Sequence, residues 1–132
     1  MKVVFDLREV LFQRRGWQRY GVNLLKNLIQ FDDVECSFIE NKIKAEAAFP
    51  FLFSKTVRVV TMKINPFARK GLPSNDFIES HDIYHSLTDY PEFIPRRARL
   101  IATIHDISSQ LFSHCHSPRF VKLMANNLKT IA

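Results

Sequence analysis

Short apolar runs in this chain end abruptly in polar residues, and segments with helical spacing separate them. "KVVFDLR" turns polar at Asp6, "DIYHSLTD" at His85, and "ARLIATIHDISSQ" at His105 and Asp106. Runs that are apolar at successive positions are typical of strands buried on both faces, as in parallel sheets. The alternation predicts an α/β fold of three layers: a mostly parallel sheet covered by helices on both faces.

The same pattern predicts individual elements along the chain. We expect strands at 3–7, 34–39, 56–62, 82–85 and 100–104. We expect helices at 17–30 and 41–49, a short one capped by Ser74 that runs through Glu79, and one after Ser117-Pro118. The last helix has one apolar face, made of Phe120, Leu123, Met124 and Leu128.

The polar strand ends predict a shared site. In parallel sheets, ligands bind at the carboxyl ends of the strands, where the strand order reverses. We therefore expect Asp6, His85 and His105 at one rim, with the loop 8–16 arching over it. The helix that follows would aim its anion-attracting N-terminus into the same crevice. The alternative for any one of these residues is a local role, as a strand cap or a partner of a backbone group.

Length and charge limit the classes of partner. The chain has 132 residues, enough for one domain with a core, and a net charge of +6. A basic balance suits an anionic partner, whether nucleic acid, sugar nucleotide or phospholipid surface. No basic stripe studded with aromatic residues, as in single-strand binders, is present. The two cysteines form no motif, and we find neither a signal peptide nor a membrane-spanning run, so we expect a cytoplasmic protein with reduced thiols.

Several common catalytic motifs are incomplete. "GWQRYGVN" has the spacing of half a phosphate loop, but Val22 and Asn23 stand where Lys and Ser or Thr are needed. The dinucleotide fingerprint and the hydrolase elbow G-x-S-x-G are both missing. "SHCHS" has metal-capable side chains without a second ligand pair, so we expect no metal. On a continuing strand His105 and Asp106 would face opposite sides, which makes them a poor hydrogen-bonded dyad.

Two blocks of the chain resemble the amino-terminal domain of family-four glycosyltransferases, retaining enzymes of the GT-B architecture. The first block, "FDLREVLFQRRGWQRYGVNLLKNL", resembles the pattern Asp-x-Arg, loop, Gly-x-Gly-Arg-Tyr, Asn-Leu-Leu, with Gln18 in place of the second glycine. The second, "DIYHSLTDYPEFIP…RLIATIHDIS", is similar to the family's "DvvHs…vvtiHDl". The matching residues are Asp6, Arg8, Gly16, Arg19, Tyr20, Asn23, Leu24, Leu25, His85, Ser86, Thr103, His105 and Asp106.

The resemblance implies an activity and a site. It implies transfer of a sugar, with retention, from a nucleotide-sugar to a glycan or lipid-linked acceptor, without metal or other cofactor. His105 would be the catalytic residue that reaches the transferring sugar. The substrate-binding residues would be Gly16, Arg14, Arg15, His85 and Asp106, the two arginines holding a phosphate.

The resemblance also implies that 1–132 is a single Rossmann-like, acceptor-side domain, one half of a GT-B fold. This domain would be incomplete at its C-terminus, and the donor-binding domain would be absent. We therefore expect no turnover from it alone, and self-association through uncovered faces as one outcome. Contact with the inner face of a membrane is a further expectation, whereas specific binding to nucleic acid is not. The rival interpretation is a non-catalytic basic α/β module that binds nucleic acid or an anionic membrane. A flavodoxin-like protein, which would carry a yellow cofactor, is a remote third.

Overall fold

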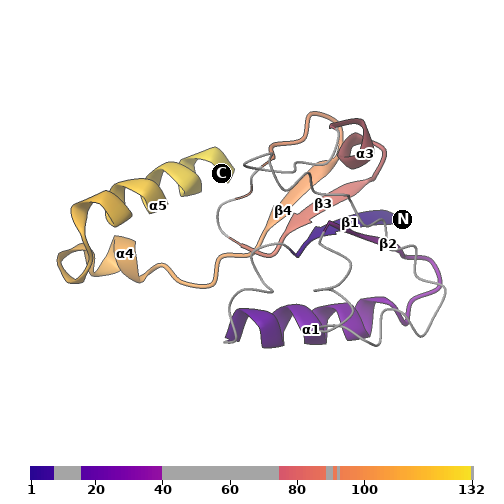
Figure 1. Ribbon diagram of the computed structural model, residues 1–132, viewed down its shortest axis with the longest axis horizontal. Helices are drawn as coiled ribbons and strands as arrows, with labels where there is room; N and C mark the ends of the chain where they lie inside the picture. The colour runs from indigo at the N-terminus through magenta and orange to yellow at the C-terminus, as the bar shows by residue number, and fades with distance from the viewer. Residues whose placement is uncertain (8–15, 40–74, 89–90, 92, 132) are drawn as a thin grey trace, which may run out of the picture.

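The computed structural model describes residues 1–7, 16–39, 75–88, 91 and 93–131. In chain order, its elements are β1 (Lys2–Asp6), α1 (Gly16–Leu28), β2 (Glu35–Ile39), α3 (Asn75–Glu79), β3 (Ile83–Ser86), β4 (Arg99–Ala102), α4 (Ser108–Leu111), the short 3-10 helix η3 (Ser113–Cys115) and α5 (Pro118–Ile131) (Figure 1). The predicted elements within these ranges are confirmed, with ends that differ by one or two residues. The structure adds α4 and η3. The predicted helix at 41–49 and strand at 56–62 lie outside the described residues.

The described strands form one open, all-parallel sheet in the order β2-β1-β3-β4. In register, Phe5 of β1 pairs with Phe38 of β2 on one side and with His85 of β3 on the other. The chain leaves β1 toward β2 and later returns to the opposite side of β1 to form β3. The strand order therefore reverses between β1 and β3, which makes their carboxyl ends a topological switch point in a Rossmann-like α/β fold.

Each face of the sheet has its own apolar cluster because successive strand residues point to opposite faces. On one face, Phe5, Phe38 and Leu87 pack with Leu25 of α1. On the other face, the cluster combines Val4, Ile39, Tyr84 and Ala98 with Ile78 of α3. Figure 1 shows α1 and α3 on opposite sides of the sheet. Strands β1, β2 and β3 are thus covered on both faces, as their sequences predict.

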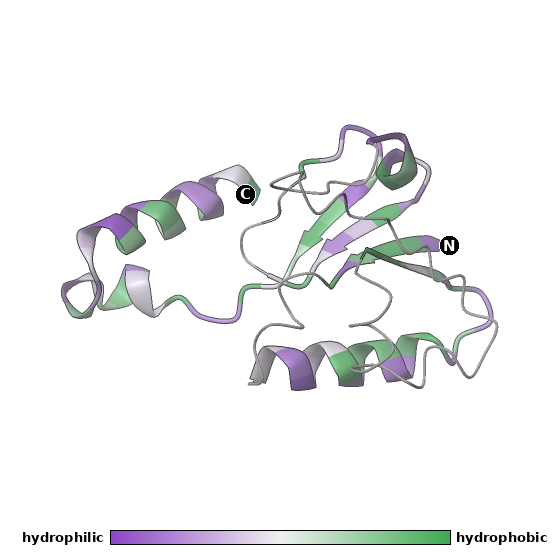
Figure 2. Cartoon of the chain, in the orientation of Figure 1, coloured by the Kyte–Doolittle hydropathy of each residue, from purple (hydrophilic) through white to green (hydrophobic). Residues whose placement is uncertain are grey.

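The segment after β4, residues 104–131, differs from the rest; we call it the C-terminal arm. Its helices α4 and α5 lie beside each other and away from the sheet (Figure 1). Figure 2 shows apolar and polar bands alternating along α5, yet Met124 is its one buried residue. Phe120 and Leu123 are 42% and 54% exposed. The predicted apolar face therefore exists, but the sheet does not bury it. β4 is also the least covered strand, with exposed and half-buried residues in alternation.

No helix among the described residues combines the length and the apolar character needed to cross a bilayer.

Candidate functional site

His105 lies just past the carboxyl end of β4, and its ring contacts a backbone carbonyl that follows the neighbouring strand, β3. Its Nε2 is 2.8 Å from the carbonyl oxygen of Leu87, the residue that follows β3. A carbonyl only accepts hydrogen bonds, so Nε2 donates and carries the hydrogen. In the neutral ring, Nδ1 then holds the lone pair, and it makes no hydrogen bond to another described residue. His105 thus offers a defined acceptor at the edge where a ligand is expected.

Two aromatic residues from the start of α1 enclose the His105 ring. The indole of Trp17 stacks on it, with centroids 4.7 Å apart and an interplanar angle of 15°. The ring of Tyr20 meets it edge-on at 5.4 Å. Residues three apart share one side of a helix, so the first turn of α1 presents both rings together. We call Trp17, Tyr20, His105 and the Leu87 carbonyl the histidine site. The N-terminus of α1 therefore lies against His105, at the carboxyl end of the sheet.

Gly16 begins α1, next to Trp17, and is exposed. A Cβ placed on Gly16 would meet no heavy atom within 4 Å, so the space beside it is open to a ligand. The predicted substrate-binding residues Arg14 and Arg15 lie outside the described residues, as does Arg8.

His85 lies inside the fold. The residue is 8% exposed, and its Nε2 is 3.0 Å from Oγ1 of Thr103. Its ring packs on Phe5, with centroids 5.3 Å apart. Burial lowers the pKa of His85 to about 4, because a charged imidazole would lose its hydration there. His85 therefore packs inside the fold beside Thr103, the residue that follows β4, and does not present its ring to the histidine site.

Asp6 lies at the same end of the sheet but on the opposite face. Its Oδ2 accepts a hydrogen bond of 2.9 Å from the hydroxyl of Tyr84, a residue of the cluster on the α3 side. His85 shares the other face with Phe5. The three residues expected at one rim therefore share an edge of the sheet, but only His105 presents a ring to the histidine site.

The carboxylate of Asp106 stabilises the local turn that leads into α4. Its Oδ1 accepts from the backbone N–H of Ser108 at 2.6 Å, and its Oδ2 accepts from the Ser108 hydroxyl at 2.9 Å. These two bonds, the backbone one first, lower the pKa of Asp106. The hydroxyl gives its only hydrogen to Asp106, so Nε2 of His116, 3.0 Å from Ser108 Oγ, acts as donor. A serine held this way is not activated as a nucleophile. His105 and Asp106 have different partners, in agreement with the expectation that they form no dyad.

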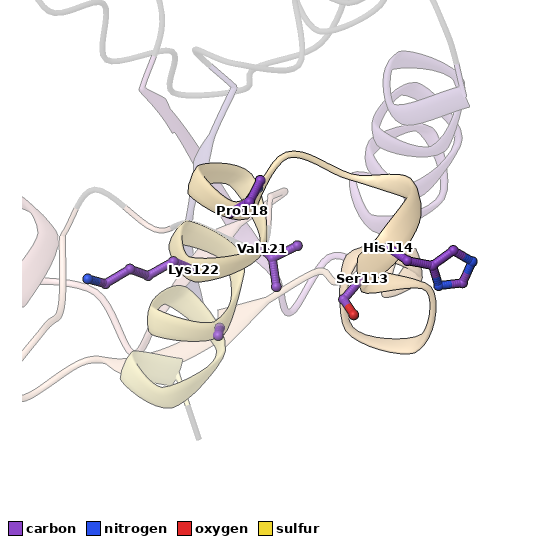
Figure 3. Close-up of a pocket in the computed structure, with 6 residues that line it drawn as sticks. Ser113, His114, Pro118, Val121 and Lys122 are labelled. Atoms are coloured by element: carbon purple, nitrogen blue, oxygen red, sulfur yellow. The ribbon is translucent and has the colours of Figure 1, made fainter.

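The "SHCHS" histidines do not gather into a metal site within the described part of the chain, where no group of three metal-capable side chains occurs. His114 instead borders a pocket of about 400 Å³ between η3 and α5, lined by Ser113, His114, Pro118, Val121, Lys122 and Ala125. In Figure 3 the side chains of His114 and Lys122 point away from each other. This pocket contains none of the predicted site residues.

No site role was predicted for Trp17 from the sequence. The signal was present: Trp17 and Tyr20 are aromatic residues three apart in the first turn of a helix whose N-terminus was expected at the crevice. The Leu87 carbonyl has no sequence signal, because any residue supplies the same group.

Comparison with protein-family models, with curated proteins and with solved structures finds no match for this chain.

Proposed function

We propose that this chain is the acceptor-side domain of a retaining glycosyltransferase that takes a sugar from a nucleotide-sugar and needs a second domain for turnover. The observation that carries the proposal is the histidine site. A neutral imidazole with its lone pair on Nδ1 accepts a hydrogen bond from a sugar hydroxyl without a metal ion. Its place beside the switch point is where α/β sheets bind ligands.

The aromatic pair supports the same substrate class. A sugar ring has an apolar face, and aromatic side chains in binding pockets supply apolar contact while a few polar groups fix orientation. In this proposal Trp17 and Tyr20 supply the apolar contact, and Nδ1 of His105 supplies the directional bond. The open space beside Gly16 leaves room for the donor phosphates near the N-terminus of α1, the end of a helix that attracts anions.

Catalysis in a two-domain cleft depends on holding donor against acceptor, so residues 1–132 alone should show no turnover with a panel of nucleotide-sugars. In the full-length polypeptide that contains them, His105→Ala should lower kcat by about 100-fold, the loss expected when a preorganised polar contact to the transition state is removed. The measurement is initial-rate transfer of radiolabelled sugar.

The matched control is His114→Ala, which removes an exposed histidine away from the histidine site and should leave the rate unchanged. Equal rates for the wild type and His105→Ala would remove His105 from the reaction. Turnover by residues 1–132 alone would overturn the need for a second domain. Tight, steeply salt-dependent binding of duplex DNA would support the rival, a non-catalytic polyanion-binding module.

A further inference from the structure

A second pocket lies at the opposite edge of the sheet, where β3 and β4 begin. It has a volume of about 560 Å³ and is lined by Met1, His81, Asp82, Ile83, Arg97 and Arg99. This volume falls within the range of small-molecule sites. The histidine site stands at the carboxyl ends of the same strands, so the two places are separated by the length of the sheet.

Two arginines line this pocket, Arg97 and Arg99, and neither side chain forms an ion pair with a carboxylate of the described residues. Arg99 is the first residue of β4, and Arg97 is two positions earlier. Both are exposed. A guanidinium presents a planar fork of donors that matches a phosphate or carboxylate. Two such unpaired groups on one pocket wall favour an anionic ligand.

The nearby carboxylates are already engaged with the backbone. Asp82 Oδ2 accepts from the backbone N–H of Lys2 at 2.7 Å. Glu79 accepts from three successive backbone N–H groups, those of Arg96, Arg97 and Ala98, at 2.6, 2.7 and 3.1 Å. These bonds fix the segment that carries the arginines. The Glu79 carboxylate also interacts electrostatically with Arg97, so Arg99 is the less compensated of the two cations.

His81 adds a third polar group whose orientation is set. Its Nδ1 is 2.8 Å from the Phe77 carbonyl oxygen, to which it donates. The Phe77 ring meets the imidazole edge-on at 4.8 Å. The residue is only 9% exposed. Nε2 is therefore the ring nitrogen left to contact a ligand, and it makes no hydrogen bond to another described residue.

We propose that this pocket, which we call the arginine pocket, binds the phosphate group of a small ligand, with Arg99 as the main contact, Arg97 as the second and His81 as a third polar group. This inference does not depend on the proposed function, because it concerns the other edge of the sheet.

Pyrophosphate is the probe, titrated into the full 132-residue chain at low ionic strength and followed by amide chemical shifts. We expect saturable binding with shifts centred on 81–83 and 97–99. Arg99→Gln should weaken binding by about tenfold, the value of one charge-assisted hydrogen-bonding group, and Arg97→Gln by less. Both side chains are exposed, so both variants should keep the amide spectrum of the folded wild type.

Arg96→Gln is the matched control. It removes the same charge from the adjacent exposed residue, which does not line the pocket, and it keeps the backbone bond to Glu79. An equal loss from Arg96→Gln would reduce the effect to general charge and overturn the pocket. Absence of saturable binding, or shifts centred elsewhere, would do so as well.

A lipid headgroup is the other source of the same chemistry, so co-sedimentation with phosphatidic acid vesicles forms the second arm. Vesicle binding that is lost in Arg99→Gln and competed by pyrophosphate assigns the phosphate to a lipid. Pyrophosphate binding without vesicle binding assigns it to a soluble ligand. Failure of the pyrophosphate arm overturns the proposal whether or not vesicles bind, whereas the proposed function depends on the separate test of His105.

Discussion

The sheet with α1 and the C-terminal arm are built from similarly apolar segments, but they bury them very differently. In the sheet, Phe5, Leu7 and Leu25 are 0% exposed. In the arm, Leu111, Phe112 and Leu123 are 65%, 55% and 54% exposed. The difference arises because β1 and β3 each lie between two strands, with apolar clusters on both faces of the sheet, whereas among the described residues α4 is the main neighbour of α5. The apolar pattern thus defines which side of a helix is hydrophobic, whereas burial of that side depends on the presence of a tertiary neighbour.

The largest expected effect comes from truncating a phenylalanine in each of the two regions and comparing the losses of stability. Phe5→Ala removes a ring that is 0% exposed and that packs on Phe38 and His85, so it should lower the free energy of unfolding by about 3–5 kcal/mol. Phe120→Ala removes a ring that is 42% exposed and should cost about 0.5 kcal/mol. Urea unfolding measured by circular dichroism gives both values. Similar losses for the two variants would mean that the arm is packed as tightly as the sheet.

The next largest effect is a pH dependence of stability that arises from the burial of His85 in the sheet. The pKa of His85 is about 4 in the fold against an ordinary value of 6.5. Between these pH values the unfolded chain binds more protons, so stability is full above pH 6.5 and declines as the pH falls toward 4, by up to about 3 kcal/mol. Unfolding curves recorded across this window measure the slope.

His85→Gln should flatten that slope, and His114→Gln, which changes an exposed histidine of the arm, should leave it as in the wild type. A slope that survives in His85→Gln would show that another group is responsible.

The smallest expected effect concerns the helix cap of α5 and tests whether the arm unfolds separately from the sheet. The hydroxyl of Ser117 accepts from the backbone N–H of Phe120 at 3.3 Å and caps α5, which begins with Pro118. Ser117→Ala should destabilise the helix by about 1 kcal/mol. Because α5 is nearly independent of the sheet, this loss should speed hydrogen exchange in 118–131 and leave exchange in β1 and β3 unchanged. Ser113→Ala, at another exposed serine of the arm, serves as control. Faster exchange in the sheet would show that the two regions unfold together.

Much of the fold follows from local patterns. The runs around Val4 and Tyr84 are apolar on both faces, and only a strand inside a covered sheet accommodates such runs. The cap at Ser117 and the proline after it define the start of α5 from sequence alone. The exposure of Leu123 was not predictable, because an apolar stripe states a preference and not the presence of a partner. The short α4 depends on a turn held by Asp106, a contact too local to leave a periodic pattern.

The candidate site was predictable in part for a related reason. The position of His105 follows from the rule that parallel strands gather their carboxyl ends at one edge. The face of the sheet on which each side chain lies depends on the strand register and on where each strand ends. For this reason Asp6 lies on the face of Tyr84, whereas His85 lies on the opposite face with Phe5. The arginine pocket was not predicted, because Arg97 and Arg99 meet His81 only through the pairing of β3 with β4.

The strand order also determines how distant parts of the chain are joined. The amino group of Met1 donates to the Asp33 carbonyl, 32 residues away, whereas the next residue, Lys2, bonds to Asp82, 80 residues away. In the unfolded chain, bringing together residues 80 apart instead of 32 apart costs only about 0.8 kcal/mol more, since the entropy of loop closure grows with the logarithm of loop length. The parallel order thus joins the amino terminus to residues that are remote in the sequence at little additional entropic cost.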